Sequence, residues 1–190
     1  MLRKIYYPIL FQGNRKRRNY FEGWYFRQAS GDEKTVISFI PGISLFEKDR
    51  HSFLQYILVA LDDEDRKRTK TGYIRYDLES FEASNDPFSI KVGENFFWEG
   101  KMIIRSHEEN FSIQGEIELG PFLSIKASPS ALNIMGPFAY LPGMECYHGV
   151  ISMVHSLKGS LCIDGRMVDF NGGKGYIEKD WGTSFPKDYI

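Results

Sequence analysis

The chain has 190 residues, of which 42% are hydrophobic and 26% charged, so it is long enough for one globular domain and too apolar for a disordered protein. Its net charge of −1 lacks the basic excess that phosphate binding requires, which excludes a general nucleic-acid binder. The aromatic share of 15% favours β-structure and supplies rings that can line an apolar cavity.

The two cysteines, Cys146 and Cys162, are too far apart in sequence for a CxxC redox site or a zinc ribbon, and two buried thiols in a reducing compartment are the simplest interpretation. No apolar run approaches the ~20 residues of a membrane span. Pro8 and Gln12 interrupt the N-terminal apolar stretch before it reaches the length of a secretory signal. We therefore expect a cytoplasmic protein, and peripheral contact with a membrane remains open.

Residues 1–19 read as an irregular lead-in, because Pro8 and Gly13 break it. It carries the basic cluster 14–18 (NRKRR), which is either a solvated loop or a contact for an anionic headgroup or diphosphate. The first predicted strand follows at residues 20–28 (YFEGWYFRQ).

Alternation along this first strand sorts its side chains onto two faces. Glu22, Trp24 and Phe26 share one face, and Tyr25 lies on the other with Arg27. A carboxylate beside a tryptophan is either a buried acid or a rim residue that is hydrogen-bonded to the backbone.

The rest of the chain alternates short β-branched and aromatic runs with turn residues, and it has no heptads, fixed-period repeats or low-complexity tracts. The remaining predicted strands are residues 35–40, 52–61, 73–78, 88–92, 95–98, 101–106, 111–119, 122–127, 147–156, 160–163, 167–170 and 174–181. Pro41 and Gly42 are predicted to end a strand, and residues 62–70 to form an exposed hairpin loop. Asp164-Gly165 is the strongest hairpin signal.

One segment breaks this rhythm. Residues 128–143 (SPSALNIMGPFAYLPG) hold three prolines, two glycines and several large apolar residues. A long apolar loop of this kind is a lid or pocket wall, or else a connector packed on the end of the sheet.

The predicted fold class is all-β. Ten to twelve short antiparallel strands fit a barrel or a sandwich. A closed antiparallel barrel is preferred because closure removes exposed sheet edges, and such a barrel can hold one small apolar ligand.

The chemistry is predicted to centre on residues 172–189 (GGKGYIEKDWGTSFPKDY). Glu178 and Asp180 share a face of the last strand, and Lys179 and Trp181 share the other. If both carboxylates point into an apolar cavity, repulsion and desolvation keep one protonated near neutral pH, as a general acid requires. The alternative is that they face solvent or pair with a lysine. Our working hypothesis is that strands bring this stretch and the Glu22 stretch to one pocket.

His148, in the run ECYHG, is the best functional candidate among the four histidines because it follows the apolar loop. His155 has the opposite strand parity, so a two-histidine metal site on this strand is not expected. The sequence has no phosphate loop, dinucleotide fingerprint or nucleophile elbow. We predict neither a metal nor a cofactor.

Three stretches resemble the tocopherol cyclase-like family: YFEGWYFRQ at 20–28, MECYHGVISMVHSLKGSLCIDG at 144–165, and GGKGYIEKDWGTSFP at 172–186. Pro8 and the run FQG at 11–13 resemble its lead-in. The resemblance implies a lipocalin-like β-barrel, distantly related to carotenoid hydratases. It also implies that residues 1–190 are the N-terminal portion, the first of two barrel-like halves, with the second half expected in a full-length chain.

Members of that family close a ring from a prenylated hydroquinone. The reaction needs an acid to protonate the alkene, a dry cavity, and aromatic rings that stabilise the carbocation by roughly 0.5–2 kcal/mol each. The resemblance points to Asp180, Glu178 and Glu22 as candidate acids. The candidate substrate-binding residues are Trp24, Tyr25, His148 and Trp181.

Two main functions follow as alternatives. The chain is either a cyclase or hydratase acting on an isoprenoid alkene, or a non-catalytic protein that carries a prenylated quinol, isoprenoid or other lipid unchanged. A structural half-domain without either activity is the third interpretation. In the first two, the expected partner is a hydrophobic small molecule.

Overall fold

The computed structural model describes residues 4, 6–16, 18–62, 64–126, 128 and 133–184, which form an all-β structure. Its strands are β1 (Phe21–Ala29), β2 (Thr35–Phe46), β3 (Asp49–Leu61), β4 (Lys67–Tyr76), β5 (Phe81–Asn85), β6 (Phe88–Val92), β7 (Asn95–Trp98), β8 (Lys101–Glu108), β9 (Phe111–Leu119), β10 (Cys146–Ile163), β11 (Arg166–Asp169) and β12 (Lys174–Gly182). Three short 3-10 helices are also described: η1 (Gly13–Arg15), η2 (Leu78–Ser80) and η3 (Gly136–Tyr140).

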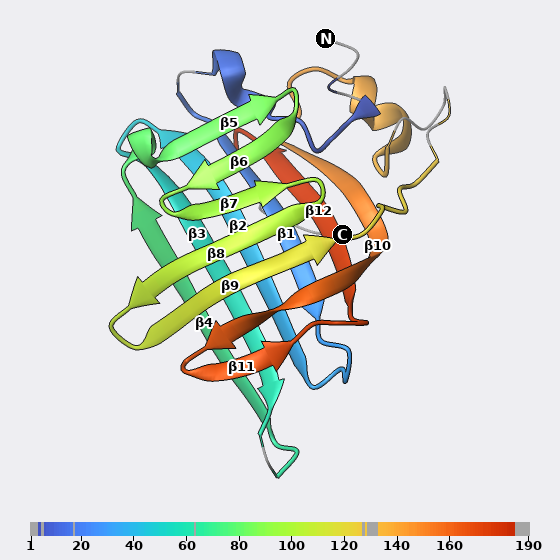
Figure 1. Cartoon of the computed structure of the whole chain (residues 1–190). Helices are drawn as coiled ribbons and strands as arrows, with labels where there is room; N and C mark the ends of the chain where they lie inside the picture. Colours follow the sequence, from blue (N-terminus) through green and yellow to red (C-terminus); the bar gives the residue numbers. More distant parts are fainter. Residues whose placement is uncertain are drawn as a thin grey trace.

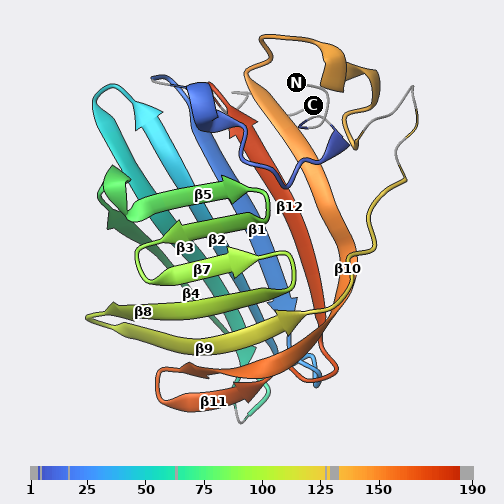
Figure 2. The same cartoon turned by 45° about the horizontal axis from the view of Figure 1, so that its top comes forward.

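All twelve strands belong to one antiparallel sheet in the order β4-β3-β2-β1-β12-β10-β9-β8-β7-β6-β5, with β11 paired to β10. The sheet folds over into two layers, so that β5–β9 cross in front of β1–β4 (Figures 1 and 2). β10 belongs to both layers, because residues 146–156 pair with β12 and residues 157–163 pair with β9.

Aromatic side chains fill the space between the layers. The ring of Phe26 on β1 lies 4.9 Å from that of Phe97 on β7, and Tyr56 on β3 stacks at 4.0 Å on Phe111 of β9. This core follows from the alternation of the strands: in β9, Phe111, Ile113 and Ile117 are buried, while the residues between them are more exposed.

The antiparallel all-β class is confirmed, but closure into a barrel is not detected. Among the described residues no ladder joins the two edge strands, β4 and β5. The short helix η2 carries the chain from one layer to the other, and the layers then pack face to face. The β4 edge meets the other layer through side chains instead, since Lys70 bonds Asp164 at 2.9 Å and the carbonyl of Asn110. Packed side chains occupy the interior that a barrel would leave for a ligand.

Several predicted boundaries were wrong. β2 continues through Pro41, which sits where the β1–β2 ladder is interrupted and no proline N–H is needed. Residues 67–70 of the predicted loop belong to β4, and β5 was missed. Residues 122–127 were predicted as a strand, but the described part of this range, residues 122–126, forms only an isolated bridge at Leu123, and residue 127 lies outside the described residues.

The regions at the two ends of the chain are described in part. Residues 185–190 lie outside the described residues, whereas the last predicted strand, 174–181, is described and corresponds to β12. Part of the apolar loop, residues 129–132, also lies outside them, while the remainder carries η3. In the described part of the chain, no helix combines the length and apolarity needed to cross a membrane.

Candidate functional site

The two stretches that carry the candidate acids form neighbouring strands. β1 pairs with β12 along its whole length, and β12 pairs on its other side with β10. In this register Gly23 lies opposite Asp180, and Asp180 lies opposite His148. The motifs at the two ends of the chain thus lie side by side in the sheet.

The candidate carboxylates nevertheless point to opposite faces. Glu22 faces the interior together with Lys179, and both side chains are 0% exposed. Glu178 and Asp180 face outward, with side chains 27% and 37% exposed. Because side chains alternate strictly along each strand, neighbouring strands cannot bring these groups together. Contrary to the working hypothesis, the three carboxylates do not share one pocket.

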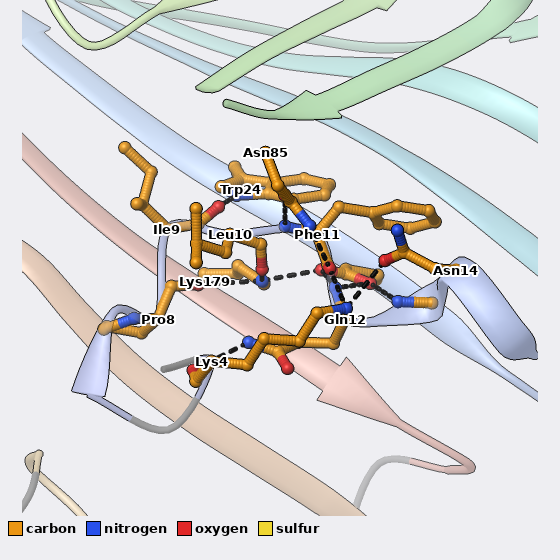
Figure 3. A network of polar contacts seen from close by, with 12 residues as sticks. Lys4, Pro8, Ile9, Leu10, Phe11, Gln12, Asn14, Trp24, Asn85 and Lys179 are labelled. Atoms are coloured by element: carbon orange, nitrogen blue, oxygen red, sulfur yellow. Dashed lines mark hydrogen bonds and ion pairs between the residues drawn. The ribbon is translucent and has the colours of Figure 1, made fainter. Parts of the chain in front are cut away.

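Glu22 lies in a buried polar network (Figure 3). Its carboxylate is 2.6 Å from the Lys179 ammonium and accepts a 2.6 Å hydrogen bond from the hydroxyl of Tyr20. It also accepts backbone N–H bonds from Gln12 at 2.8 Å and Gly13 at 2.9 Å. Burial, with the adjacent Glu22 charge, raises the pKa of Tyr20, so its hydroxyl remains a donor. These partners occupy the carboxylate, which gives Glu22 the surroundings of a structural residue.

The same network holds the N-terminal strap, which we define as residues 8–13. Nζ of Lys179 donates to the carbonyl oxygens of Pro8 at 2.8 Å and Leu10 at 2.6 Å. Nε1 of Trp24 donates to the carbonyl of Ile9 at 2.7 Å. An irregular segment with no strand partner thereby has its backbone groups satisfied by buried side chains, as a buried loop requires.

The strap also reaches the second layer. Asn85 at the end of β5 accepts a 2.7 Å hydrogen bond from the backbone N–H of Phe11 and donates one of 3.1 Å to its carbonyl. The strap therefore connects β1 and β12 to β5 across one end of the two-layered structure (Figure 3).

The two tryptophans predicted to stabilise a carbocation already face a cation. The Lys179 ammonium lies 4.6 Å from the Trp24 ring and 4.8 Å from the Trp181 ring. Trp181 also stacks on Tyr147 with ring centroids 5.7 Å apart. Burial lowers the pKa of Lys179 to about 8, while the Glu22 carboxylate acts in the opposite direction.

On the opposite face, four titratable side chains form what we call the outer-face cluster: Tyr176, Glu178, Asp180 and His148. Nδ1 of His148 is 2.8 Å from Oδ1 of Asp180, and its Nε2 is 3.7 Å from Oε2 of Glu178. The hydroxyl of Tyr176 donates to the same Glu178 oxygen at 2.5 Å. One imidazole is thus held between two carboxylates on an accessible face.

The electrostatics of this cluster suit proton transfer. The hydrogen bond to Asp180 raises the pKa of His148 against the opposing effect of burial. Burial and the hydrogen bond to Glu178 raise the pKa of Tyr176, which keeps its hydroxyl neutral. The cluster therefore holds a group that can carry a proton near neutral pH beside groups that can accept one.

Tyr25 joins this face from β1, where it lies opposite Glu178 in the register. Its hydroxyl accepts a 2.8 Å hydrogen bond from Oγ of Ser38 on β2. Of the predicted substrate-binding residues, Tyr25 and His148 therefore lie with Glu178 and Asp180, whereas Trp24 lies with Glu22.

Beside the cluster, two glycines face each other on neighbouring strands, Gly23 on β1 and Gly42 on β2. A β-carbon on Gly42 would lie 2.5 Å from Cζ of Phe53, and one on Gly23 would lie 3.4 Å from Cγ2 of Ile40. The Phe53 ring also stacks on Tyr73 of β4 at 5.0 Å. Apolar and aromatic side chains of β2, β3 and β4 therefore lie on the outer face, on the side of Gly23 away from Asp180.

The cavities lie elsewhere. One of about 990 Å³ is lined by residues of both layers, among them Tyr76 of β4, Arg105 of β8 and Cys162 of β10. Another of about 590 Å³ is mostly apolar and lies between the strap, β10 and residues 122–125. Neither cavity is lined by Glu22, Glu178 or Asp180.

Sequence reasoning missed the roles of three residues. For Lys179 the sequence predicted the strand face that it shares with Trp181, but not its contact with Glu22. The pairing of β1 with β12 puts that face on the same side of the sheet as Glu22. Tyr176 was missed because tyrosines are common in this chain, although it stands two residues before Glu178 on the same face. His155 was set aside as structural, and it is buried with Nε2 unpartnered next to Gln28, whose amide atoms also lack partners.

No group of three His, Cys, Asp or Glu side chains within the described ranges is arranged to hold a metal ion.

The comparisons with known proteins concern the fold. No protein-family model matches the chain, and no curated protein matches it. An AttH-like protein from Nitrosomonas europaea superposes with a TM-score of 0.50 at 15% identity, over 88% of this chain and 52% of that one. Kievitone hydratase from Nectria haematococca superposes with a TM-score of 0.42 at 11% identity, over 85% of this chain and 46% of that one.

The chain therefore spans about half the length of these two solved structures. The resemblance of its motifs to the tocopherol cyclase-like family stays a prediction, since no family model supports it. What the superposition establishes is that the chain shares its all-β fold with the AttH-like protein.

Proposed function

We propose that the outer-face cluster transfers protons to a hydrophobic, alkene-bearing ligand of the isoprenoid or prenylated-quinol class, in a tocopherol cyclase-like ring closure or hydration. The observation that carries this proposal is the His148 imidazole held between Asp180 and Glu178 on an accessible sheet face. Among the predicted acids, these two carboxylates are the ones with access to a ligand.

The two ring nitrogens of His148 have different surroundings, which suggests different tasks. Nδ1 faces Asp180, whose charge favours the imidazolium. Nε2 is left to deliver a proton to one carbon of the alkene, which leaves a tertiary carbocation at the other carbon. A hydroxyl oxygen of the ligand or of water then bonds to the cationic carbon and loses its proton to Glu178, 3.7 Å from Nε2. Proton return from Glu178 to His148 completes the cycle without a net change in protons.

The ligand's apolar part would lie over the outer-face side chains next to Gly23 and Gly42, among them Ile40 and Phe53. Tyr25 is the ring best placed to face a carbocation, because the Lys179 ammonium already lies against the rings of Trp24 and Trp181. In the proposed site, Tyr25 therefore takes the carbocation-stabilising role that was predicted for Trp24, Tyr25 and Trp181 together.

The His148, Glu178 and Asp180 side chains are 35%, 27% and 37% exposed on the described chain, and a carbocation needs a dry site. We propose that a second barrel-like half covers this outer face and excludes water. The chain's span of about half of the AttH-like structure is consistent with this arrangement.

The test uses the full-length gene product with a prenylated hydroquinone, and chromatography with mass spectrometry measures the chromanol or hydrated product. Asp180→Asn and Glu178→Gln are each expected to lower turnover by roughly 100-fold or more, in the range of lost acid–base catalysis, with ligand affinity kept. Glu118→Gln, on the other layer with a side chain 60% exposed, is the matched control. Full activity in both site variants would remove the cluster from the mechanism.

The second candidate function is a non-catalytic carrier of a hydrophobic ligand. The apolar cavity of about 590 Å³, whose lining includes none of the candidate acids, favours it. A carrier returns the prenylated hydroquinone unchanged after saturable binding, and its binding is insensitive to Asp180→Asn. Detection of a cyclised product would exclude this function.

A further inference from the structure

Large apolar side chains gather on the surface at one end of the molecule. Phe138, Ile134 and Leu141 are 59%, 52% and 51% exposed, and Tyr6, Tyr7 and Tyr140 are also exposed. Both views place η1 and η3 at this end (Figures 1 and 2). Tyr6 and Tyr7 belong to it because they line one cavity with Asn133, which shortly precedes η3. We call these six residues the apolar tip. Contiguous exposed apolar residues on a soluble domain mark a surface that binds something.

The apolar tip is displayed on anchored backbone. The hydroxyl of Tyr147 donates to the carbonyl of Leu141 at 2.7 Å, and the backbone N–H of His148 contacts Sδ of Met135 at 3.1 Å. Within η3, the backbone N–H of Leu141 bonds the carbonyl of Phe138. The segment is therefore held against β10 while its large side chains face water.

The charge of this end is distinctive. Residues 1–21 contain six of the 24 basic residues of the chain and none of the 25 acidic ones, so the rest of the molecule is acidic. Lys16 is exposed beside η1, and the Arg18 side chain is 74% exposed, in a surface ion pair of 3.4 Å with Glu47 that headgroup phosphates could replace. Basic charge and exposed apolar rings thus occur at the same end of the molecule.

The apolar cavity of about 590 Å³ is at this end too. Tyr6 and Tyr7 of the apolar tip line it together with Ile125 and Ile151. A hydrophobic molecule leaving an apolar phase at the tip would meet this cavity without crossing bulk water.

We propose that the apolar tip docks on an anionic membrane surface, with Phe138 and Leu141 entering the acyl-chain boundary while Lys16 and Arg18 face the lipid headgroups. Stable peripheral binding takes two signals, an apolar one and a basic one, and each is present here. A cationic surface would repel Lys16 and Arg18. A purely polar partner would leave the apolar tip unburied. This proposal does not depend on the proposed chemistry.

The test is cosedimentation of the protein with vesicles of phosphatidylcholine alone or mixed with phosphatidylserine. We expect binding to the mixed vesicles, weakened by high salt because the basic contacts are screened. The double variant Phe138→Asp with Leu141→Asp should reduce binding by about tenfold or more, since each substitution removes an apolar group that would be buried in the membrane. Met167→Asp on β11, at a residue 68% exposed and far from the tip, is the matched control.

Three outcomes overturn the proposal: no binding to either vesicle, equal binding of the tip variant, or loss of a dimer in the tip variant without any vesicle binding. The last assigns the apolar tip to a second copy of the chain. Lys16→Glu with Arg18→Glu separates the two signals, because it should abolish the preference for phosphatidylserine. Folding of every variant is checked by circular dichroism, and none of these residues belongs to the outer-face cluster.

Discussion

Nζ of Lys179 lies 2.6 Å from Oε1 of Glu22, and solvent reaches neither side chain. A buried ion pair recovers its desolvation cost only where further hydrogen bonds satisfy both groups. Here those bonds come from the N-terminal strap, whose carbonyls accept from Lys179 and whose N–H groups donate to Glu22. The pair therefore joins the first residues of the chain to the last strand.

Lys179→Met should destabilise the protein by about 3–5 kcal/mol, because it leaves the Glu22 charge buried without its cation. Urea unfolding measures the change. Lys174→Met, an exposed lysine on the same strand, is the control and should have little effect. Adding Glu22→Gln to Lys179→Met should restore part of the loss, and a fully additive double variant would contradict the coupling.

His155 should make the protein acid-sensitive. Burial lowers its pKa to about 4 from the ordinary 6.5, so between these values the unfolded chain binds the proton and the folded chain does not. Stability is therefore lost as the pH falls from 6.5 to 4, by up to about 3 kcal/mol. Urea unfolding of His155→Leu across this range should show a flatter pH dependence than the wild type. His107→Leu, the same replacement at an exposed histidine, is the control for the substitution itself.

His148 should titrate above its ordinary pKa because Asp180 stabilises the imidazolium. Its contribution to stability is present at low pH and is lost as the pH rises through the raised pKa. An NMR titration of the imidazole measures this pKa. Asp180→Asn should lower it more than Glu178→Gln does, since Asp180 is the hydrogen-bonded partner at 2.8 Å. An equal effect of the two variants would contradict the geometry of the cluster.

Gly42→Ala should destabilise the protein by roughly 1–3 kcal/mol through overpacking. The new methyl would lie 2.5 Å from the backbone oxygen of Glu22 and 2.5 Å from the ring of Phe53, so β1 or the ring must move. Thermal unfolding measures the loss. Gly100→Ala is the control, because nothing lies within 4 Å of its β-carbon position.

Alternation along strands was the most informative signal in the sequence. It placed Glu22, Trp24 and Phe26 on one face, and all three are buried. It also separated Lys179 from its two acidic neighbours. The strands at 88–92, 95–98 and 111–119 were predicted to the residue because turn residues bound each of them.

The remaining features depend on long-range packing, which local patterns do not contain. Pro41 ends a strand by local rules, yet β3 continues its pairing with β2 beyond this point. The parities of Glu22 and Asp180 were known separately, but which faces coincide follows from the pairing of β1 with β12. Closure into a barrel was preferred because it removes exposed sheet edges, and the way the sheet folds over depends on η2 and β10.

β10 hydrogen-bonds to β12 over its first residues and to β9 over its last, with bulges between residues 150 and 155. A single continuous ribbon therefore transmits tension between the halves of the sheet. Pulling the chain apart along β10 would have to shear both ladders before either half could peel away. Because β10 belongs to both ladders, we expect mechanical unfolding in a single large event rather than in two small ones.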